Sequence, residues 1–173
     1  REKVVKVLGP AWKVAFTATA HGAHKIRSAM YRNSDAPLRR CIVFLNGRSE
    51  WIEKNMELPE SLDLPADCGF LTLDHRGQGA SSGERAFIAS YDDYIQDVAA
   101  VMKERIPAEV PYVMMAHSMG SLIALYGTMK GVFNPKRLVL CSPLLALPNL
   151  PVPRFVSIPL SKLLSGLGFG GMR

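Results

Sequence analysis

Short runs of mainly apolar residues recur along the first 143 residues, separated by polar loops and by longer amphipathic segments. A run without apolar–polar alternation is typical of a strand buried on both faces of a sheet. Four such strands are predicted, at residues 41–45, 69–73, 113–116 and 137–141. Two earlier segments, 13–19 and 25–31, predict a hairpin with His21 and Gly22 in its turn.

Helical patterns lie between the predicted strands. Residues 51–62 predict a helix kinked or broken at Pro59. Apolar residues on one face between Tyr94 and Ile106 predict a second helix with Ser90 as its N-cap, and residues 122–129 predict a third. Buried strands that alternate with helices predict an α/β fold with a mostly parallel sheet and helices on both faces.

The alternation stops after Pro143, where prolines gather over residues 148–159 and glycines close the sequence. We therefore expect residues 1–147 to form the core portion and residues 148–173 to begin a lid or cap insertion. The chain starts at Arg1 rather than Met and stops within that segment. These features predict the N-terminal portion of a longer protein.

Composition and charge exclude several classes of function. The 173 residues carry a net charge of +6, but residues 110–173 contain six basic and no acidic residues. No basic stripe interleaved with aromatic residues indicates nucleic-acid binding. Three scattered cysteines suggest neither disulfides nor a metal site, no apolar run reaches the ~18 residues of a membrane span, and no metal or organic cofactor is implied. We expect a cytoplasmic protein and leave peripheral membrane contact open.

The strongest chemical signal is the segment from Ala116 to Gly120, between a predicted strand and a helix. A serine at its centre, Ser118, would lie on a sharp strand-to-helix turn that needs small residues two positions before and after it. The amide of Met119, at the helix N-terminus, would stabilise an oxyanion. The alternative is an ordinary turn that happens to contain a serine.

The second signal is Asn46-Gly47-Arg48, after the first buried strand. In serine hydrolases the second oxyanion donor comes from this loop, so Gly47 would allow close approach and the amide of Arg48 would donate. A common Asn-Gly turn is the alternative.

The glycine-rich segment from Asp74 to Gly83 also follows a strand. Its glycine spacing does not fit a dinucleotide loop, because the third glycine falls one place late. We expect Asp74 and His75 to be structural residues of a charged, hydrogen-bonded loop near the rim of the active site.

Five motifs together resemble the alpha/beta-hydrolase superfamily, in particular its monoacylglycerol lipase and lysophospholipase group, often labelled serine aminopeptidase-like. The motifs are Leu45-Asn46-Gly47-Arg48-Ser49-Glu50-Trp51, Asp74-His75-Arg76-Gly77-Gln78-Gly79-Ala80-Ser81, Tyr91-Asp92-Asp93-Tyr94, Ala116-His117-Ser118-Met119-Gly120 and Cys141-Ser142-Pro143. Their order and spacing match over roughly residues 14–147. Asn46, Ala116 and Ser121 stand where many relatives have His, Gly and Gly.

The resemblance implies a serine hydrolase that cleaves acyl esters of the monoacylglycerol or lysophospholipid type. Ser118 would be the nucleophile, the amides of Arg48 and Met119 would form the oxyanion hole, and an apolar lid would shape the acyl pocket. The family's order is nucleophile, acid, histidine. No Asp, Glu or His follows Ser118, so the implied partner is the missing C-terminal half of the same protein.

This absence predicts a chain that is nearly inactive alone, and it leaves two alternatives open. One is a non-catalytic, truncated protein that binds an acyl ligand or a partner. The other is a membrane-surface module formed by the apolar and basic residues 152–173.

Overall fold

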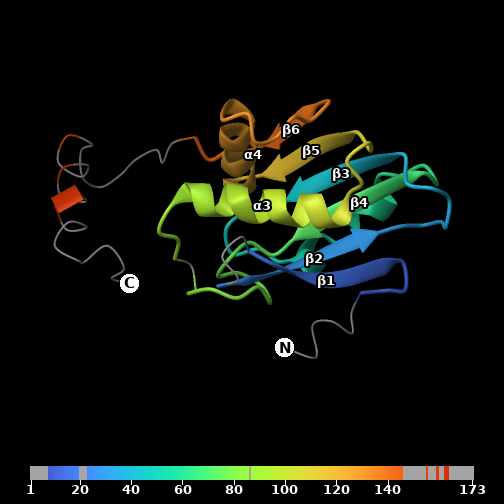
Figure 1. Cartoon of the computed structure of the whole chain (residues 1–173), viewed down its shortest axis with the longest axis horizontal. Coiled ribbons are helices and arrows are strands. Elements are labelled where there is room, and N and C mark those ends of the chain that lie inside the picture. Colours follow the sequence, from blue (N-terminus) through green and yellow to red (C-terminus); the bar gives the residue numbers. More distant parts are fainter. Residues whose placement is uncertain are drawn as a thin grey trace. The chain divides into compact units, whose positions relative to one another are not determined.

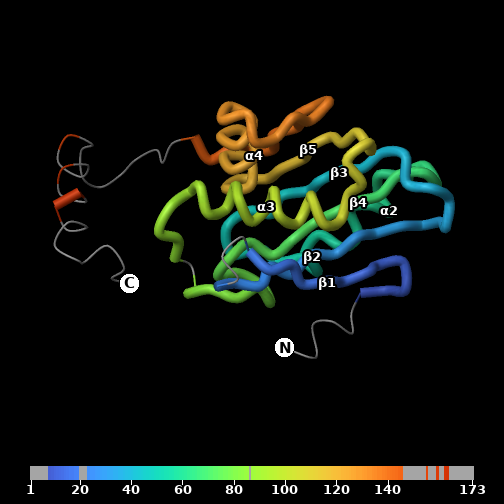
Figure 2. Tube along the Cα trace, in the orientation of Figure 1, coloured from blue at the N-terminus to red at the C-terminus, as the bar shows by residue number. Residues whose placement is uncertain are grey.

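The computed structural model describes residues 8–19, 23–85 and 87–145, together with Phe155, Pro159, Lys162 and Leu163. The chain divides into two units, Arg1–Pro143 and Leu144–Arg173, and every described strand belongs to the first (Figures 1 and 2). The predicted turn at His21 and Gly22 lies outside the described residues. So does the predicted lid, apart from the four single residues just named.

The described strands form one sheet, in the order β1-β2-β4-β3-β5-β6 (Figure 1). β1 pairs antiparallel with β2, and β2 with β4, whereas the pairs β3–β4, β3–β5 and β5–β6 are parallel. The six predicted strands are confirmed to within one residue at each end. They are β1 (Trp12–Ala18), β2 (Lys25–Tyr31), β3 (Arg40–Leu45), β4 (Cys68–Leu73), β5 (Tyr112–His117) and β6 (Leu138–Cys141).

The strand order reverses direction at β3. From β3 the chain passes to β4 on one side of it and later returns to β5 on the other side. In open α/β sheets, ligands bind outside the carboxyl ends of the strands at such a switch point. The loops that follow β3, β4 and β5 are therefore the part of the fold in which a functional site is expected.

Two longer helices follow the sequence pattern closely. In α3 (Tyr91–Arg105) the Ser90 side chain caps the first turn, accepting a hydrogen bond from the Asp92 amide at 3.2 Å. α4 (Met119–Met129) begins three residues before the predicted start, because the strand passes directly into the helix at Ser118. The α3 and α4 helices contact each other, and α3 lies in front of the sheet in Figure 1.

The predicted helix over residues 51–62 is broken, but not at Pro59. The segment forms a short 3-10 helix, η1 (Ile52–Asn55), and a single α-turn, α2 (Leu58–Ser61). Pro59 does not kink a helix but lies at its first turn, where the missing amide hydrogen costs no intrahelical bond. A turn at Met56 and Glu57 separates the two pieces.

An aromatic cluster fills one face of the sheet. The rings of Phe44 and Phe70 stack at 5.8 Å, and Leu58 and Leu64, from α2 and the segment after it, pack against the same cluster. Toward β5 and β6 the same face is less covered, since Val139 is 45% exposed. The sheet is thus best buried around β3 and β4, the strands that carry the loops described next.

Candidate active site

Ser118 occupies a strained turn between β5 and α4. Its backbone angles are φ 51° and ψ −116°, in a region that a residue with a side chain rarely adopts. Hydrogen bonds on both sides hold the turn: the Ser118 amide donates to the Cys141 carbonyl at 3.0 Å, and its carbonyl accepts from the Ser121 amide at 3.1 Å. The structure thus has the sharp strand-to-helix turn that the sequence predicts, with a half-buried serine at its apex.

The small residues that flank this turn are required by its surroundings. A Cβ added to Gly120 would lie 2.2 Å from the Leu45 carbonyl oxygen and 2.6 Å from that of Asn46, so helix α4 starts directly against the end of β3. Ala116 is fully buried. Its carbonyl accepts a hydrogen bond from the Ser121 hydroxyl at 2.8 Å, which gives this serine a structural use.

The loop after β3 touches the serine turn. A Cβ added to Gly47 would meet the Ser118 Cβ at 3.2 Å and the His117 Nδ1 at 3.1 Å. Among the described residues, neither the Arg48 amide nor the Met119 amide has a hydrogen-bond acceptor. Two backbone donors without an acceptor among the described residues therefore flank the serine, one from each loop.

Glu50 ties the two loops together, and the sequence reasoning gave it no role. It is 7% exposed, and its Oε2 accepts a hydrogen bond from the Gly47 amide at 2.8 Å and lies 3.3 Å from the His117 Nδ1. Its Oε1 accepts from the Lys54 ammonium at 2.7 Å. Burial raises the pKa of Glu50, but the hydrogen bonds from Lys54, Gly47 and His117 outweigh it, so the pKa lies below its usual value. Its position in the Asn-Gly-Arg-Ser-Glu motif was the available signal.

His117 precedes the serine in sequence but does not bond to it. Its Nδ1 faces Glu50, and the Ser118 hydroxyl has no hydrogen-bond partner among the described residues. In this arrangement the His117 Nδ1 is directed to Glu50 rather than to the serine hydroxyl.

The loop after β4 is a buried polar structure, as the sequence predicts. Asp74 accepts hydrogen bonds from the amides of Ile52 and Ala80, each at 2.8 Å, and from the Arg27 guanidinium at 3.1 Å. The His75 Nε2 donates to the Asn46 carbonyl at 3.1 Å. Burial lowers the pKa of His75 to about 4, so this ring is neutral at pH 7. Both residues position loops rather than face the serine.

The side chain of Asn46, which stands where many relatives have histidine, is also fixed by hydrogen bonds. Its amide nitrogen donates to the Leu73 carbonyl at 2.9 Å, and its side-chain oxygen accepts from Asn55 at 3.1 Å. The departure from the usual residue therefore leaves the loop anchored to β4.

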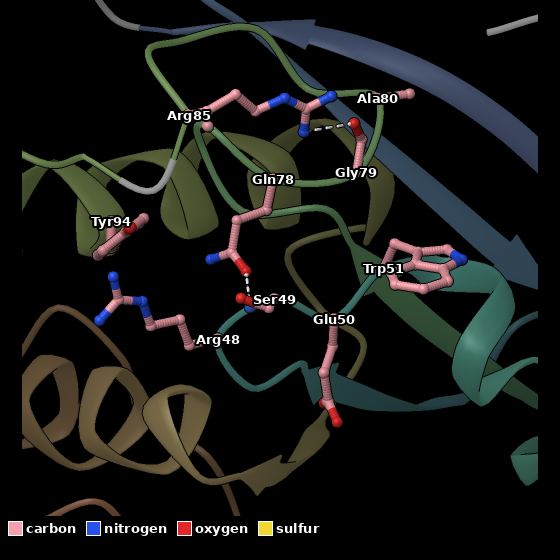
Figure 3. Close-up of a pocket in the computed structure, with 10 residues that line it drawn as sticks. Arg48, Ser49, Glu50, Trp51, Gln78, Gly79, Ala80, Arg85 and Tyr94 are labelled. Atoms are coloured by element: carbon pink, nitrogen blue, oxygen red, sulfur yellow. Dashed lines mark hydrogen bonds between the residues drawn. The ribbon is translucent and has the colours of Figure 1, made fainter. Parts of the chain in front are cut away.

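A pocket of about 560 Å³ opens beside the oxyanion loop. One wall is formed by residues 48–51 and the other by residues 77–80 and Arg85, with Tyr94 of α3 between them (Figure 3). The Gln78 side chain joins the walls by accepting a hydrogen bond from the Ser49 amide at 2.6 Å. Ser118 does not line this pocket. The lining includes Arg48, which follows Gly47, and Gly47 lies against Ser118.

The strand order, the strained serine after β5 and the glycine loop after β3 define the chain as an α/β-hydrolase fold. Solved structures agree. The chain superposes on a thermostable carboxyl esterase from Bacillus coagulans with a TM-score of 0.67 and 20% identity, covering 92% of this chain and 52% of that one. For a monoacylglycerol lipase from Paleococcus ferrophilus the TM-score is 0.64, with 24% identity and coverages of 81% and 51%.

Residues 36–169 match the family model described as serine aminopeptidase, S33, and the chain belongs to this family. It is 30% identical over 115 residues to a probable lysophospholipase L2 from Haemophilus influenzae, covering 63% of this chain and 36% of the relative. It is also 30% identical over 111 residues to a monoglyceride lipase homolog from Monkeypox virus, covering 61% and 39%. The chain thus spans well under half the length of the curated relatives it matches.

The fold and family expected from the five motifs are therefore confirmed. In the part of the chain that the structure describes, no helix is both long and apolar enough to cross a membrane.

Proposed function

We propose that this chain carries the nucleophile and oxyanion hole of a serine hydrolase that cleaves acyl esters of lipids. The observation that carries the proposal is the contact between two loops. The strained Ser118 turn meets the Gly47 loop, and each loop brings an amide without a partner among the described residues. An ordinary turn needs neither the backbone strain nor this close approach.

The chemistry follows from these groups. The Ser118 oxygen attacks the ester carbonyl and loses its proton to a base, and the carbonyl oxygen becomes an oxyanion. The Arg48 and Met119 amides donate to that oxyanion, aided by the positive end of the α4 dipole. The alcohol then leaves with a proton, and water hydrolyses the acyl-enzyme.

This mechanism needs a histidine and an acid that the sequence does not supply after Ser118. Loss of either group costs several orders of magnitude in rate. We infer that both come from residues beyond these 173, as in a hydrolase whose triad follows the order serine, acid, histidine. The names of the relatives, a lysophospholipase and a monoglyceride lipase homolog, support glycerol-based lipid esters as the substrate class.

Labelling with a fluorophosphonate probe tests the proposal directly, on the whole gene product. We expect the probe to attach to Ser118 in the native protein, to be lost in Ser118→Ala, and to be retained in Ser142→Ala. Ser142 is a matched control because it also has a positive φ, 47°, after the neighbouring strand. A folded protein that is not labelled at Ser118 contradicts the hydrolase and favours a non-catalytic ligand-binding protein.

A further inference from the structure

The pocket beside the oxyanion loop carries more positive charge than the acyl chemistry requires. Arg48 lies on one wall and Arg85 on the other (Figure 3). The proposed mechanism uses neither side chain, because Arg48 contributes only its backbone amide and Arg85 has no part in it. The Arg48 guanidinium therefore calls for a separate explanation.

The Arg48 guanidinium has no hydrogen-bond or ion-pair partner among the described residues. It extends toward Tyr94, a buried, neutral side chain (Figure 3). The Arg85 Nη1 donates to the Gly79 carbonyl at 3.0 Å, which directs this guanidinium along the opposite wall.

Among the described residues that line the pocket, Glu50 is the one carboxylate, and it already has partners. Glu50 bonds to Lys54, to the Gly47 amide and to His117, so its charge is balanced within the loop. The Arg48 guanidinium therefore brings to the pocket a positive charge that no described residue balances. Guanidinium groups bind phosphate oxygens through paired N–H donors, which makes arginine a preferred phosphate ligand.

We propose that this pocket binds the phosphate of a lysophospholipid headgroup, with Arg48 as the principal ligand and Arg85 on the facing wall. The inference rests on the proposed function and selects among its substrates. In a lysophospholipid only the glycerol unit separates the scissile ester from the phosphate. The structure has the same adjacency, because Arg48 follows the glycine that touches Ser118. A neutral monoacylglycerol would offer Arg48 no charge.

The test compares two esters that share one short acyl chain, lysophosphatidylglycerol and monoacylglycerol, on the whole gene product. The measured quantity is the ratio of their kcat/KM values, because any disturbance of the Arg48 amide affects both substrates and cancels. We expect Arg48→Gln to lower this ratio about tenfold or more, as a lost charge-assisted hydrogen bond predicts. Arg85→Gln should lower it less, and Arg48→Lys should restore part of it.

Arg39→Gln is the matched control. Arg39 is exposed, lies outside the pocket and carries the same charge, so its loss should leave the ratio unchanged. Raising the salt from about 50 to about 300 mM should lower the native ratio, since salt screens exposed charges.

Binding without turnover gives the second measurement. Ser118→Ala protein should bind sn-glycerol 3-phosphate, bind glycerol much more weakly, and lose the difference when Arg48→Gln is added. Inorganic phosphate bound as tightly as glycerol phosphate would overturn the lipid-headgroup assignment. Arginine variants that lower both kcat/KM values equally would overturn the phosphate pocket, yet leave the ester hydrolase intact. Failure of Ser118 labelling would instead overturn the proposed function itself.

Discussion

Replacing Gly120 with alanine tests the packing on which the serine turn depends. The added Cβ would lie 2.2 Å from the Leu45 carbonyl oxygen, 0.8 Å inside the 3.0 Å below which real Cβ contacts are essentially never seen. The neighbours are backbone atoms of Leu45 and Asn46, at the end of β3, a strand paired on both sides, so no side chain can rotate away. Helix α4 must therefore shift relative to β3.

The magnitude follows from two opposing effects. Overpacking in a core costs about 1–3 kcal/mol, and backbone neighbours place this site at the upper end. Alanine recovers about 0.5–1 kcal/mol of helix propensity. We expect a net loss of about 2–2.5 kcal/mol in the free energy of unfolding, or roughly 4–10 °C in Tm. A shift of Ser118 by about 1 Å should also slow fluorophosphonate labelling about 100-fold.

Urea denaturation and labelling kinetics on the whole gene product measure both effects. Gly9→Ala is the control, because no atom lies within 4 Å of its added Cβ and its φ is not positive. It should change stability by less than about 1 kcal/mol. A Gly120→Ala protein that matches the native one in both stability and labelling rate would refute the steric reasoning.

Three further predictions concern the same loops. Ser118→Gly should be about 1 kcal/mol more stable than Ser118→Ala, since glycine tolerates the positive φ of this turn, and equal urea midpoints would contradict this. The Glu50 carboxylate has a lowered folded-state pKa, so its stabilising effect is present above its unfolded pKa of about 4.3 and disappears as the pH falls through the folded value. The stability difference between native protein and Glu50→Gln should therefore shrink below about pH 4, and a difference that stays constant from pH 7 to pH 3 would count against the hydrogen-bonded carboxylate. Asp74→Asn, which removes a charge beside the buried Arg27, should cost about 3 kcal/mol in thermal unfolding, and a loss below about 1 kcal/mol would show that Glu53 alone balances Arg27.

Continuous apolar runs made the strands β3 to β6 predictable. In a strand such as Cys68–Leu73, which is buried along its whole length, Thr72 is the one polar residue, so the segment stands out as an apolar run. The serine turn was predictable for a similar reason, since its steric demands restrict residues close by in sequence. The break in the segment 51–62 was not, because its apolar residues belong to two short helices, and the turn at Met56 and Glu57 between them leaves no trace in the periodicity.

The role of Glu50 and the position of the pocket could not be read from local sequence. Glu50 acts on His117, 67 residues away, and the pocket joins segments that meet only when β3 and β4 pair in parallel. From the sequence alone, a carboxylate in a polar loop is expected to be exposed, because the strand that buries it lies far away in the chain. Such residues become visible only through a family motif or through the folded structure.

Asp74 holds both walls of the pocket at once. Its carboxylate accepts the amide of Ile52, beside the first wall, and the amide of Ala80 in the second, while Gln78 joins the walls through Ser49. Neither wall can move without straining a bond to the other. The energetic effects of substitutions in the two walls will therefore not add, and the substrate preference of this pocket can be understood only from changes made in both walls together.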